Sequence, residues 1–306
     1  MKIITCCFWL MIISLAFTFP VSAQTVTWDD LMQSGNQALT QNRPAEAEQS
    51  FRDALKLIEK SGEKDPRKPV TLIKLAAVCD LQSKRDEAET LASESILVLE
   101  KLSFSSKVTD GVNFSAALNT TTELYELAAG LFASHQKYPQ AETLYQKKIK
   151  FCEKVLALTK EQPTSNDDFL RFLVLATSGI HEKLTATYDK LANLYFAQKK
   201  YDQAEKMLNQ SLKEKKVVYK DDSPIVASAL ANLASLFAAQ GKYEKAEPLY
   251  KQALSIFEQS QALGRPEVAS ILGNYILLLK KTGREAEVKG LVEHLKAQAN
   301  QTQPVK

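Results

Sequence analysis

The sequence is poor in the residues that build metal sites, disulfide frameworks and loop-rich folds. Its 306 residues include only four cysteines, three histidines, ten glycines and ten prolines. Low glycine and proline content favours helices, and the cysteine count is too low for a fold built on disulfides. The histidines, His135, His181 and His294, lie in no cluster with metal-ligand spacing. We therefore expect no metal site and no cofactor.

The sequence also lacks a strong charge bias and the motifs of common enzymes. The formal net charge is +3 at pH 7, and no basic run stands out, so nucleic acid is not an expected partner. There is no glycine-rich phosphate loop, Gly-x-Ser-x-Gly turn or Cys-x-x-Cys pair. Asp167 and Asp168 fit a helix start better than an acid and base pair. We predict no catalytic residues and no enzymatic activity.

The first residues differ in character from the rest. Lys2 precedes an apolar stretch from Ile3 to Phe19, which is followed by Pro20 and by the small-residue pattern Val21-Ser22-Ala23. This pattern predicts a signal peptide over residues 1–23 and an exported, periplasmic or secreted protein that begins at Gln24. A cleaved signal leaves no membrane insertion; the alternative is an uncleaved N-terminal membrane anchor.

Two cysteines remain after removal of the signal. Cys79 and Cys152 each lie among apolar residues at helical spacing. This spacing fits buried thiols that act as small hydrophobes. We expect both to be free, although an oxidising compartment would permit a disulfide.

One short unit is reused along the chain. Stretches that begin at Leu191, Leu233 and Tyr275 read alike at a spacing of 42 residues. Because so small a unit cannot bury its own apolar face, copies must stack into an elongated solenoid with a continuous core. An alanine opens the second helix of each unit, with valine in the last, at spacings of 41, 53, 63, 42 and 42; these residues are Ala47, Ala88, Ala141, Ala204, Ala246 and Val288. The sequence therefore predicts six helix pairs, with two insertions.

Start and stop signals explain why pairs form rather than single long helices. Ser223-Pro224 and Arg265-Pro266 fit helix starts, because proline at the first helical position lacks a donor that had no partner anyway. Gly241 and Gly283 fall between the two helices of their pairs, where a residue past a helix end often needs a left-handed conformation.

The apolar pattern resembles a known repeat. The positions that carry the likeness are Leu230, Leu233, Ala234, Phe237, Gly241, Tyr243, Ala246, Tyr250 and Ala253. They resemble the tetratricopeptide repeat in its 42-residue, kinesin light chain-like form, over roughly residues 27–298. The resemblance implies an all-α, right-handed superhelical solenoid of about six antiparallel helix pairs over residues 24–306. The expected repeats lie near 28–60, 69–102, 122–159, 182–217, 224–260 and 266–298.

The two insertions are the least repeat-like segments. Residues 103–119 are rich in Ser, Thr and Asn and read as a surface loop. After Pro163, the run Ser165-Asn166-Asp167-Asp168 resembles a capping box. It predicts an additional helix there or a lengthened first helix of the fourth repeat.

The resemblance also implies where a ligand would lie. In such folds the first helices line a concave groove, and residues six and nine places into each unit point toward a bound segment. Asparagine offers both donors and an acceptor, so a ladder of asparagines can bind a peptide backbone, while Lys190 and Lys281 could pair with acidic groups. The alternative is that these polar residues only keep the helix face soluble. The expected peptide-binding residues are Lys190, Asn193, Asn232, Ser235, Asn274, Leu277 and Lys281.

These observations lead to two hypotheses on function. The first is an exported, non-enzymatic scaffold that binds a peptide or protein segment in the concave groove. The second is a structural envelope protein that associates with itself into a homo-oligomer and has no dedicated ligand. The residues do not identify the partner.

Overall fold

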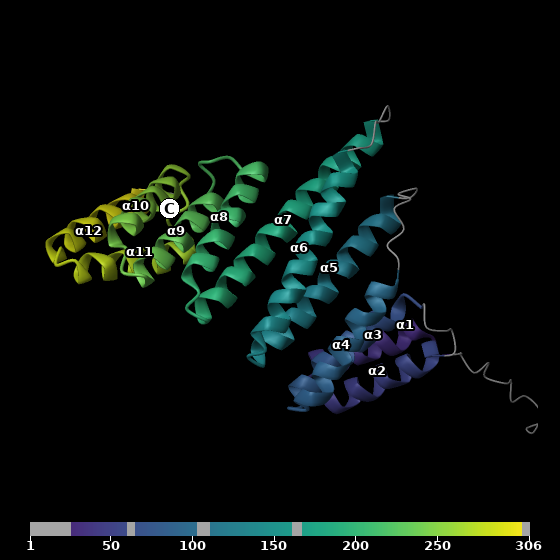
Figure 1. Ribbon diagram of the computed structural model, residues 1–306. Coiled ribbons are helices and arrows are strands. Elements are labelled where there is room, and N and C mark those ends of the chain that lie inside the picture. The colour runs from purple at the N-terminus through teal and green to yellow at the C-terminus, as the bar shows by residue number, and fades with distance from the viewer. Residues whose placement is uncertain (1–25, 60–64, 103–110, 161–166, 302–306) are drawn as a thin grey trace, which may run out of the picture. The chain divides into compact units, whose positions relative to one another are not determined.

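The computed structural model describes residues 26–59, 65–102, 111–160 and 167–301. Over these ranges the chain forms twelve α-helices and no strand (Figure 1). The predicted signal peptide lies outside the described residues. The helices are α1 (Trp28–Thr40), α2 (Pro44–Glu59), α3 (Arg67–Leu81), α4 (Arg85–Lys101), α5 (Gly111–Ser134), α6 (Tyr138–Lys160), α7 (Asp167–Ala197), α8 (Tyr201–Val218), α9 (Pro224–Ala239), α10 (Tyr243–Gln259), α11 (Pro266–Lys281) and α12 (Glu285–Gln301).

The helices occur in six pairs, and the two members of every pair are separated by three residues. These breaks are residues 41–43, 82–84, 135–137, 198–200, 240–242 and 282–284. Below, the first and second members of each pair are called the first and second helices. The prediction of an all-α solenoid of helix pairs is confirmed.

The same backbone motif closes the first helix of every pair. The middle residue of each break has a left-handed φ between 56° and 74°; these residues are Asn42, Ser83, Gln136, Lys199, Gly241 and Gly283. The next residue donates its N–H to a carbonyl in the last turn of the first helix, at 2.8–2.9 Å, in the pairs Arg43–Ala38, Lys84–Cys79, Lys137–Phe132, Lys200–Tyr195, Lys242–Phe237 and Arg284–Leu279. This is the Schellman geometry, which satisfies otherwise unpaired carbonyls at a helix end.

The predicted helix starts are confirmed at α9 and α11. The Ser223 hydroxyl accepts a hydrogen bond from the Val226 N–H at 3.3 Å, and Pro224 opens α9. Pro266 opens α11 in the same way, after an extended Arg265. Prolines at these positions stop the preceding loop from extending the helix backwards.

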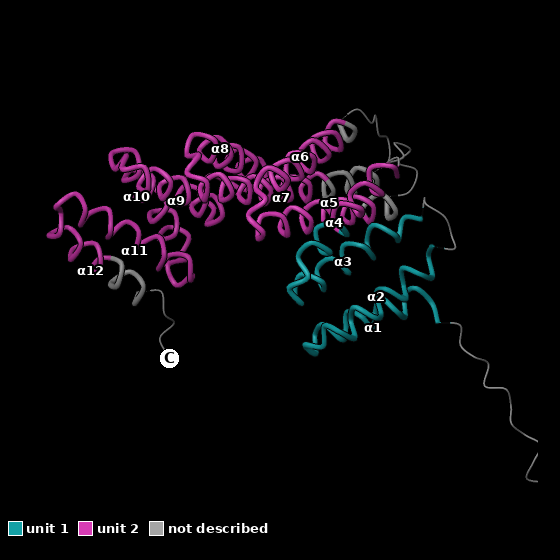
Figure 2. Tube along the Cα trace, turned by 60° about the horizontal axis from the view of Figure 1, so that its bottom comes forward, with its two compact units in different colours: residues 1–91 teal, residues 92–306 magenta. Residues whose placement is uncertain are grey.

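The chain divides into two compact units, residues 1–91 and residues 92–306 (Figure 2). In the first unit, α2 packs against both α1 and α3. In the second, each helix from α5 to α12 packs against the next, and the first helices also meet, α5 with α7 and α9 with α11. Within each unit, neighbouring helix pairs thus pack against each other, as a stacked array requires.

Small residues lie where the two helices of a pair cross. Ala47, Ala141, Ala204 and Ala246 are all at most 1% exposed. In the first pair, a Cβ built on Gly35 would lie only 2.4 Å from the ring of Phe51. Close approach of the helices therefore depends on residues with little or no side chain.

The expectation of a surface loop over residues 103–119 is wrong from Gly111 onward. Residues 103–110 lie outside the described part of the chain, but α5 begins at Gly111. Leu118 is 4% exposed and belongs to an apolar cluster with Val155, Ile180 and Leu184. Burial of this leucine outweighs the low helix propensity of the surrounding Asn and Thr residues.

The second insertion lengthens a first helix, which is one of the two expected outcomes. α7 runs for 31 residues from Asp167 to Ala197. Ile180 and Leu184 from this helix belong to one apolar cluster with Leu118 from α5, so the two insertions support each other.

Cys79 and Cys152 are buried and free, as predicted. Burial raises the pKa of each of these two thiols to about 11.

Candidate functional site

Four of the seven expected site residues line one pocket in the second unit. It lies between α9, α10 and α11 and has a volume of about 200 Å³. We call it the Asn274 pocket. Its lining consists of Ser235, Ala238, Ala239, Tyr243, Tyr250, Asn274, Leu277, Leu278 and Lys281.

Ser235 is the centre of the polar contacts in the Asn274 pocket. Its hydroxyl donates to the Ala231 carbonyl at 2.9 Å, and it accepts from the Tyr250 hydroxyl at 2.9 Å and from the Asn274 side-chain amide at 3.3 Å. Burial raises the pKa of Tyr250, so this phenol stays a donor at neutral pH. Ser235 therefore holds Asn274 in place, and the Asn274 side-chain oxygen and its second amide hydrogen remain available.

One lining residue of the pocket is smaller than its counterpart in the preceding repeat. Ala238 occupies the place that Phe196 has in the preceding repeat, 42 residues earlier. The ring of Phe196 packs edge-on against Tyr201, with centroids 5.8 Å apart. Tyr243 is the counterpart of Tyr201. Alanine at residue 238 thus leaves space that phenylalanine would fill.

Two side chains at the edge of the pocket are exposed and can contact a ligand. Leu277 is 53% exposed, although its neighbour Leu278 is buried. Lys281 is exposed, and within the described ranges it has no carboxylate partner. The pocket therefore combines an amide, an ammonium group and an apolar side chain, a set that suits a peptide better than a chemical reaction.

The other expected residues lie elsewhere on the first helices. Asn193 on α7 and Asn232 on α9 are exposed and do not line the Asn274 pocket. Lys190 on α7 contacts the Glu126 carboxylate of α5 through its ammonium group. The structure thus brings Ser235, Asn274, Leu277 and Lys281 together and leaves the remaining three apart from them.

A buried lysine behind Lys190 is a feature that the sequence interpretation missed. Lys148 of α6 is 1% exposed, and its ammonium group lies 2.5 Å from the second oxygen of Glu126. Burial lowers the pKa of Lys148, and pairing with Glu126 opposes this shift. For Glu126, burial acts to raise the pKa, but hydrogen bonds from Lys148 and Lys190 outweigh it, so the pKa is lowered. The Glu126 carboxylate of α5 therefore links Lys148 of α6 and Lys190 of α7.

The position of Lys148 carries a signal that could have revealed it. The apolar stripe of α6 contains Ala141, Leu144, Tyr145, Cys152 and Val155, all buried. Lys148 falls on this stripe at helical spacing. A charged residue on a buried stripe needs a partner, because an unpaired buried charge is costly.

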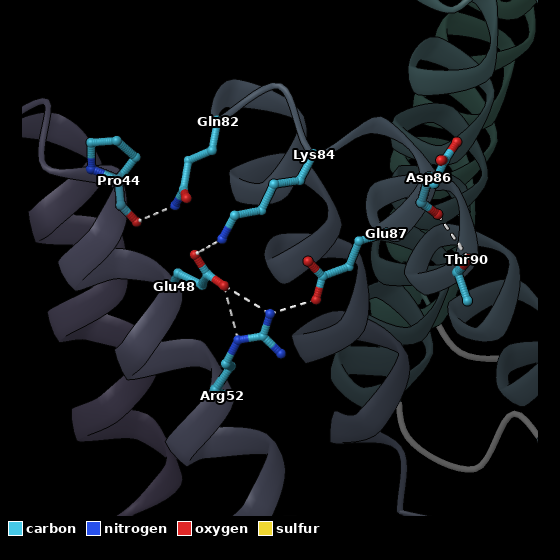
Figure 3. Close-up of polar contacts among 8 residues, drawn as sticks. All are labelled: Pro44, Glu48, Arg52, Gln82, Lys84, Asp86, Glu87 and Thr90. Atoms are coloured by element: carbon cyan, nitrogen blue, oxygen red, sulfur yellow. Dashed lines mark hydrogen bonds and ion pairs between the residues drawn. The ribbon is translucent and has the colours of Figure 1, made fainter.

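A second polar cluster lies in the first unit (Figure 3). The carboxylate of Glu48 on α2 accepts from Lys84 at 2.7 Å and from Arg52 at 2.7 Å, and Arg52 also donates to Glu87 at 2.5 Å. The hydrogen bond from Lys84 is the main reason that the pKa of Glu48 falls to about 2. We call these four residues the Glu48 network.

The Glu48 network is not suited to a metal ion, although its atoms are close together. Ligand atoms of Glu48, Cys79 and Glu87 lie within 4.8 Å of one another. Both carboxylates are already paired with cations, and the raised pKa of Cys79 opposes the thiolate that a metal would need. We interpret the cluster as an ion-pair network that links α2 to the start of α4.

None of the helices in the described ranges is both long and apolar enough to span a bilayer.

Comparison with known proteins supports the fold assignment. Residues 183–259 match the family model of the tetratricopeptide repeat. No curated protein sequence matches the chain. Among solved structures, BtubC (BKLC) from P. vanneervenii is similar over 90% of this chain and 94% of its own, with 18% identity and a TM-score of 0.53.

A second similar structure is the Podosopora anserina kinesin light chain-like protein with nearly identical TPR-like repeats. It covers 76% of this chain and 96% of its own, with 15% identity and a TM-score of 0.53. At these identities the likeness concerns the fold alone. Residues 183–259 are therefore tetratricopeptide repeats, and the chain has the fold of kinesin light chain-like repeat solenoids.

Proposed function

We propose that this protein is an exported, non-enzymatic scaffold that binds an extended segment of a partner protein on its first helices. The main contact is the Asn274 pocket. The fold is one that serves protein–protein interaction, and helix pairs offer long surfaces to extended ligands. The observation that carries the proposal is the meeting of Ser235, Asn274, Leu277 and Lys281 at one pocket.

Each group in the pocket has a separate task in this proposal. The Asn274 side chain hydrogen-bonds the backbone of the partner segment, whatever its side chains are. Leu277 and the space beside Ala238 take an apolar side chain. Lys281 pairs with an acidic group of the partner. Asn193 and Asn232 extend the backbone contacts along α7 and α9, whereas Lys190 is already paired with Glu126 and is not needed for binding.

Filling the pocket tests this proposal without removing a polar group. Partners are captured from envelope extract on the immobilised protein, and the affinity of the captured partner is measured for purified variants. Ala238→Phe introduces the residue that the preceding repeat has at this place, and we expect the fold to tolerate it. We expect at least tenfold weaker binding for Ala238→Phe and for Asn274→Ala, and a smaller loss for Asn232→Ala.

A matched control makes the result specific. Ala286→Phe is the same substitution at an exposed site of α12 outside the pocket, and it should leave the affinity unchanged. Equal affinities for Ala238→Phe and the native protein would overturn the assignment of the pocket.

Export and assembly have their own measurements. Export is supported by the apolar stretch and the small-residue pattern of the N-terminus, and mass spectrometry of the native protein should find Gln24 as the first residue. An N-terminus at Met1 would instead favour the membrane anchor. Light scattering tests the self-associating alternative, which requires a mass that rises with protein concentration.

A further inference from the structure

The second unit has another pocket, formed by different helices from the Asn274 pocket. It lies between α6, α7 and α8 and has a volume of about 340 Å³. We call its buried lining residues Tyr188 and Tyr195 of α7 the floor, and its half-buried lining residues Ile149 of α6 and Met207 of α8 the walls. We call it the Tyr188 pocket. It shares no lining residue with the Asn274 pocket.

The floor of the Tyr188 pocket presents rings rather than free hydroxyl groups. The Tyr195 hydroxyl donates to Glu142 at 2.7 Å, and the Tyr188 hydroxyl donates to Glu153 at 3.5 Å. Both tyrosines are nearly buried, whereas Ile149 and Met207 are half-buried. The accessible surface between the walls is therefore mainly apolar, and the unbranched Met207 side chain can adapt to a guest.

The rims of the pocket carry unpaired positive charge. Lys150 on α6 and Lys206 on α8 are exposed lining residues, and within the described part of the chain neither has a carboxylate partner. Lys200 adds a third ammonium group 6.0 Å from the centre of the Tyr195 ring. Glu153 is the single carboxylate among the described lining residues, and Tyr188 already donates to it. Among the described lining residues, two lysines thus face one carboxylate.

The next repeat shows that the rim charge of α8 is not a by-product of repetition. A lysine lies over the equivalent ring in both repeats, Lys200 at 6.0 Å from the centre of the Tyr195 ring and Lys245 at 5.5 Å from the centre of the Phe237 ring. At the place of Lys206, 42 residues further on, stands Pro248. Of these two repeats, only the repeat of the Tyr188 pocket therefore has the rim lysine Lys206.

We propose that the Tyr188 pocket is a second docking site, which takes a segment of a partner protein that carries an apolar side chain beside acidic ones. The apolar side chain enters between Ile149 and Met207. The acidic groups pair with Lys150 and Lys206 from the two rims, because charge-assisted contacts with unpaired lysines favour carboxylates. One chain can then hold two segments at once, a role beyond the single groove of the proposed function.

Peptide selection with a counter-selection tests this site. A displayed library of random dodecapeptides is selected on the immobilised full-length protein and depleted on the charge-reversed variant Lys150→Glu/Lys206→Glu. Enriched peptides are synthesised, and their affinities are measured by fluorescence anisotropy. We expect peptides with Asp or Glu next to an apolar residue, at least tenfold weaker binding to the charge-reversed variant, and a similar loss when the apolar residue is changed to glycine.

The control variants separate binding at this site from a general effect of charge on the protein surface. Lys154→Glu/Lys213→Glu makes the same charge change at exposed lysines of α6 and α8 outside the pocket, and circular dichroism checks that all variants fold. Binding within twofold of native for this control and for Ala238→Phe supports the proposal. If Ala238→Phe does not weaken binding of the partner captured from envelope extract, only the assignment of the Asn274 pocket is overturned. Three outcomes would overturn the proposal for the Tyr188 pocket: no peptide is enriched, the enriched peptides lack the acidic and apolar pair, or both charge variants lose binding equally.

Discussion

At the residue scale, the middle residue between paired helices must adopt a left-handed backbone conformation. The residues found there differ in how easily they adopt it. Two of the six positions have glycine, and the other four have Asn42, Ser83, Gln136 and Lys199. A non-glycine residue in this conformation costs on the order of 1 kcal/mol. The motif therefore persists because its hydrogen bonds and the packing of the two helices outweigh this cost.

Gly241→Ala is predicted to lower the free energy of unfolding by about 1 kcal/mol. The backbone is the cause, because φ at Gly241 is +74° and no atom lies within 4 Å of the position that a Cβ would take. Chemical denaturation measures the change. The control, Gly130→Ala, introduces a Cβ into equally open space inside α5, and should stabilise by about 0.5–1 kcal/mol. A loss of the same size at both sites would contradict a conformational origin.

Gly35→Ala tests close approach of α1 and α2 instead of backbone strain. The new Cβ would lie 2.4 Å from the Phe51 ring, so the ring or the helices must shift. Overpacking of this kind typically costs about 1–3 kcal/mol. In the double variant Gly35→Ala/Phe51→Leu the alanine should cost less than it does beside phenylalanine. Additive effects in this double-mutant cycle would speak against the contact.

Sequence reasoning reached some of these residues and not others. The glycines between paired helices could be recognised because glycine is the usual residue at such a position. Lys199 and Gln136 gave no such signal, since they adopt the same conformation against their own preference. Lys148 was missed because helical periodicity was read from apolar residues alone.

At the element scale, an ion pair recurs between a second helix and the break that follows in the next pair. Glu48 follows the alanine of α2 and contacts Lys84, while Glu247 follows the alanine of α10 and contacts Arg284 at 2.5 Å. The hydrogen bond from Arg284 is the main reason that the pKa of Glu247 also falls to about 2. These contacts join consecutive helix pairs at the same repeat position.

Glu48→Gln is predicted to destabilise the protein by about 1 kcal/mol at pH 7, since the partners are partly exposed. The pKa of Glu48 is about 2 in the folded protein, below its ordinary value of 4.5. Its contribution is therefore fully present above pH 4.5 and is lost as the pH falls toward 2. The difference in stability between native and variant should shrink over this range.

The matched control is Glu46→Gln. Glu46 lies on α2, like Glu48, and the only change is the loss of an exposed ion pair with Arg43. We expect a change of about 0.5 kcal/mol or less. A difference between native and Glu48→Gln that stays constant from pH 7 to pH 3 would contradict the role of the carboxylate.

Of the two insertions, the sequence predicted the helix in one and missed the helix in the other. The capping residues before α7 predicted a helix there, and a lengthened first helix is what forms. The start of α5 was not predicted because the polar residues after Gly111 dominate the local pattern. Leu118 decides the outcome through contacts with Ile180 and Leu184, which lie more than sixty residues away in sequence.

At the scale of the whole molecule, the 42-residue spacing predicted the helix pairs and their stacking, because a repeated unit can bury its apolar face only against copies of itself. The spacing could not predict which repeat opens a pocket. That depends on single differences between copies, such as Ala238 in place of Phe196, and their effect appears only once neighbouring helices are packed.

The last helix is predicted to be the least protected part of the array. Within residues 285–294, no side chain of α12 is buried, whereas α10 buries Ala246, Tyr250, Ala253, Leu254, Ile256 and Phe257. A helix that buries so little apolar surface opens at lower free energy. Hydrogen exchange followed by mass spectrometry should show faster exchange in α12 than in α10. Equal rates would indicate that the array opens as a single unit.

The most direct test of the central claim is site-specific photo-crosslinking in the native cells. A benzophenone amino acid replaces Leu277, which is 53% exposed at the edge of the Asn274 pocket, or Val217, which is 61% exposed on α8 and outside it. The account predicts a defined crosslinked product at residue 277 that is lost with Ala238→Phe, and none at residue 217. Equal yields at the two residues, or a product at residue 277 that persists with Ala238→Phe, would contradict it.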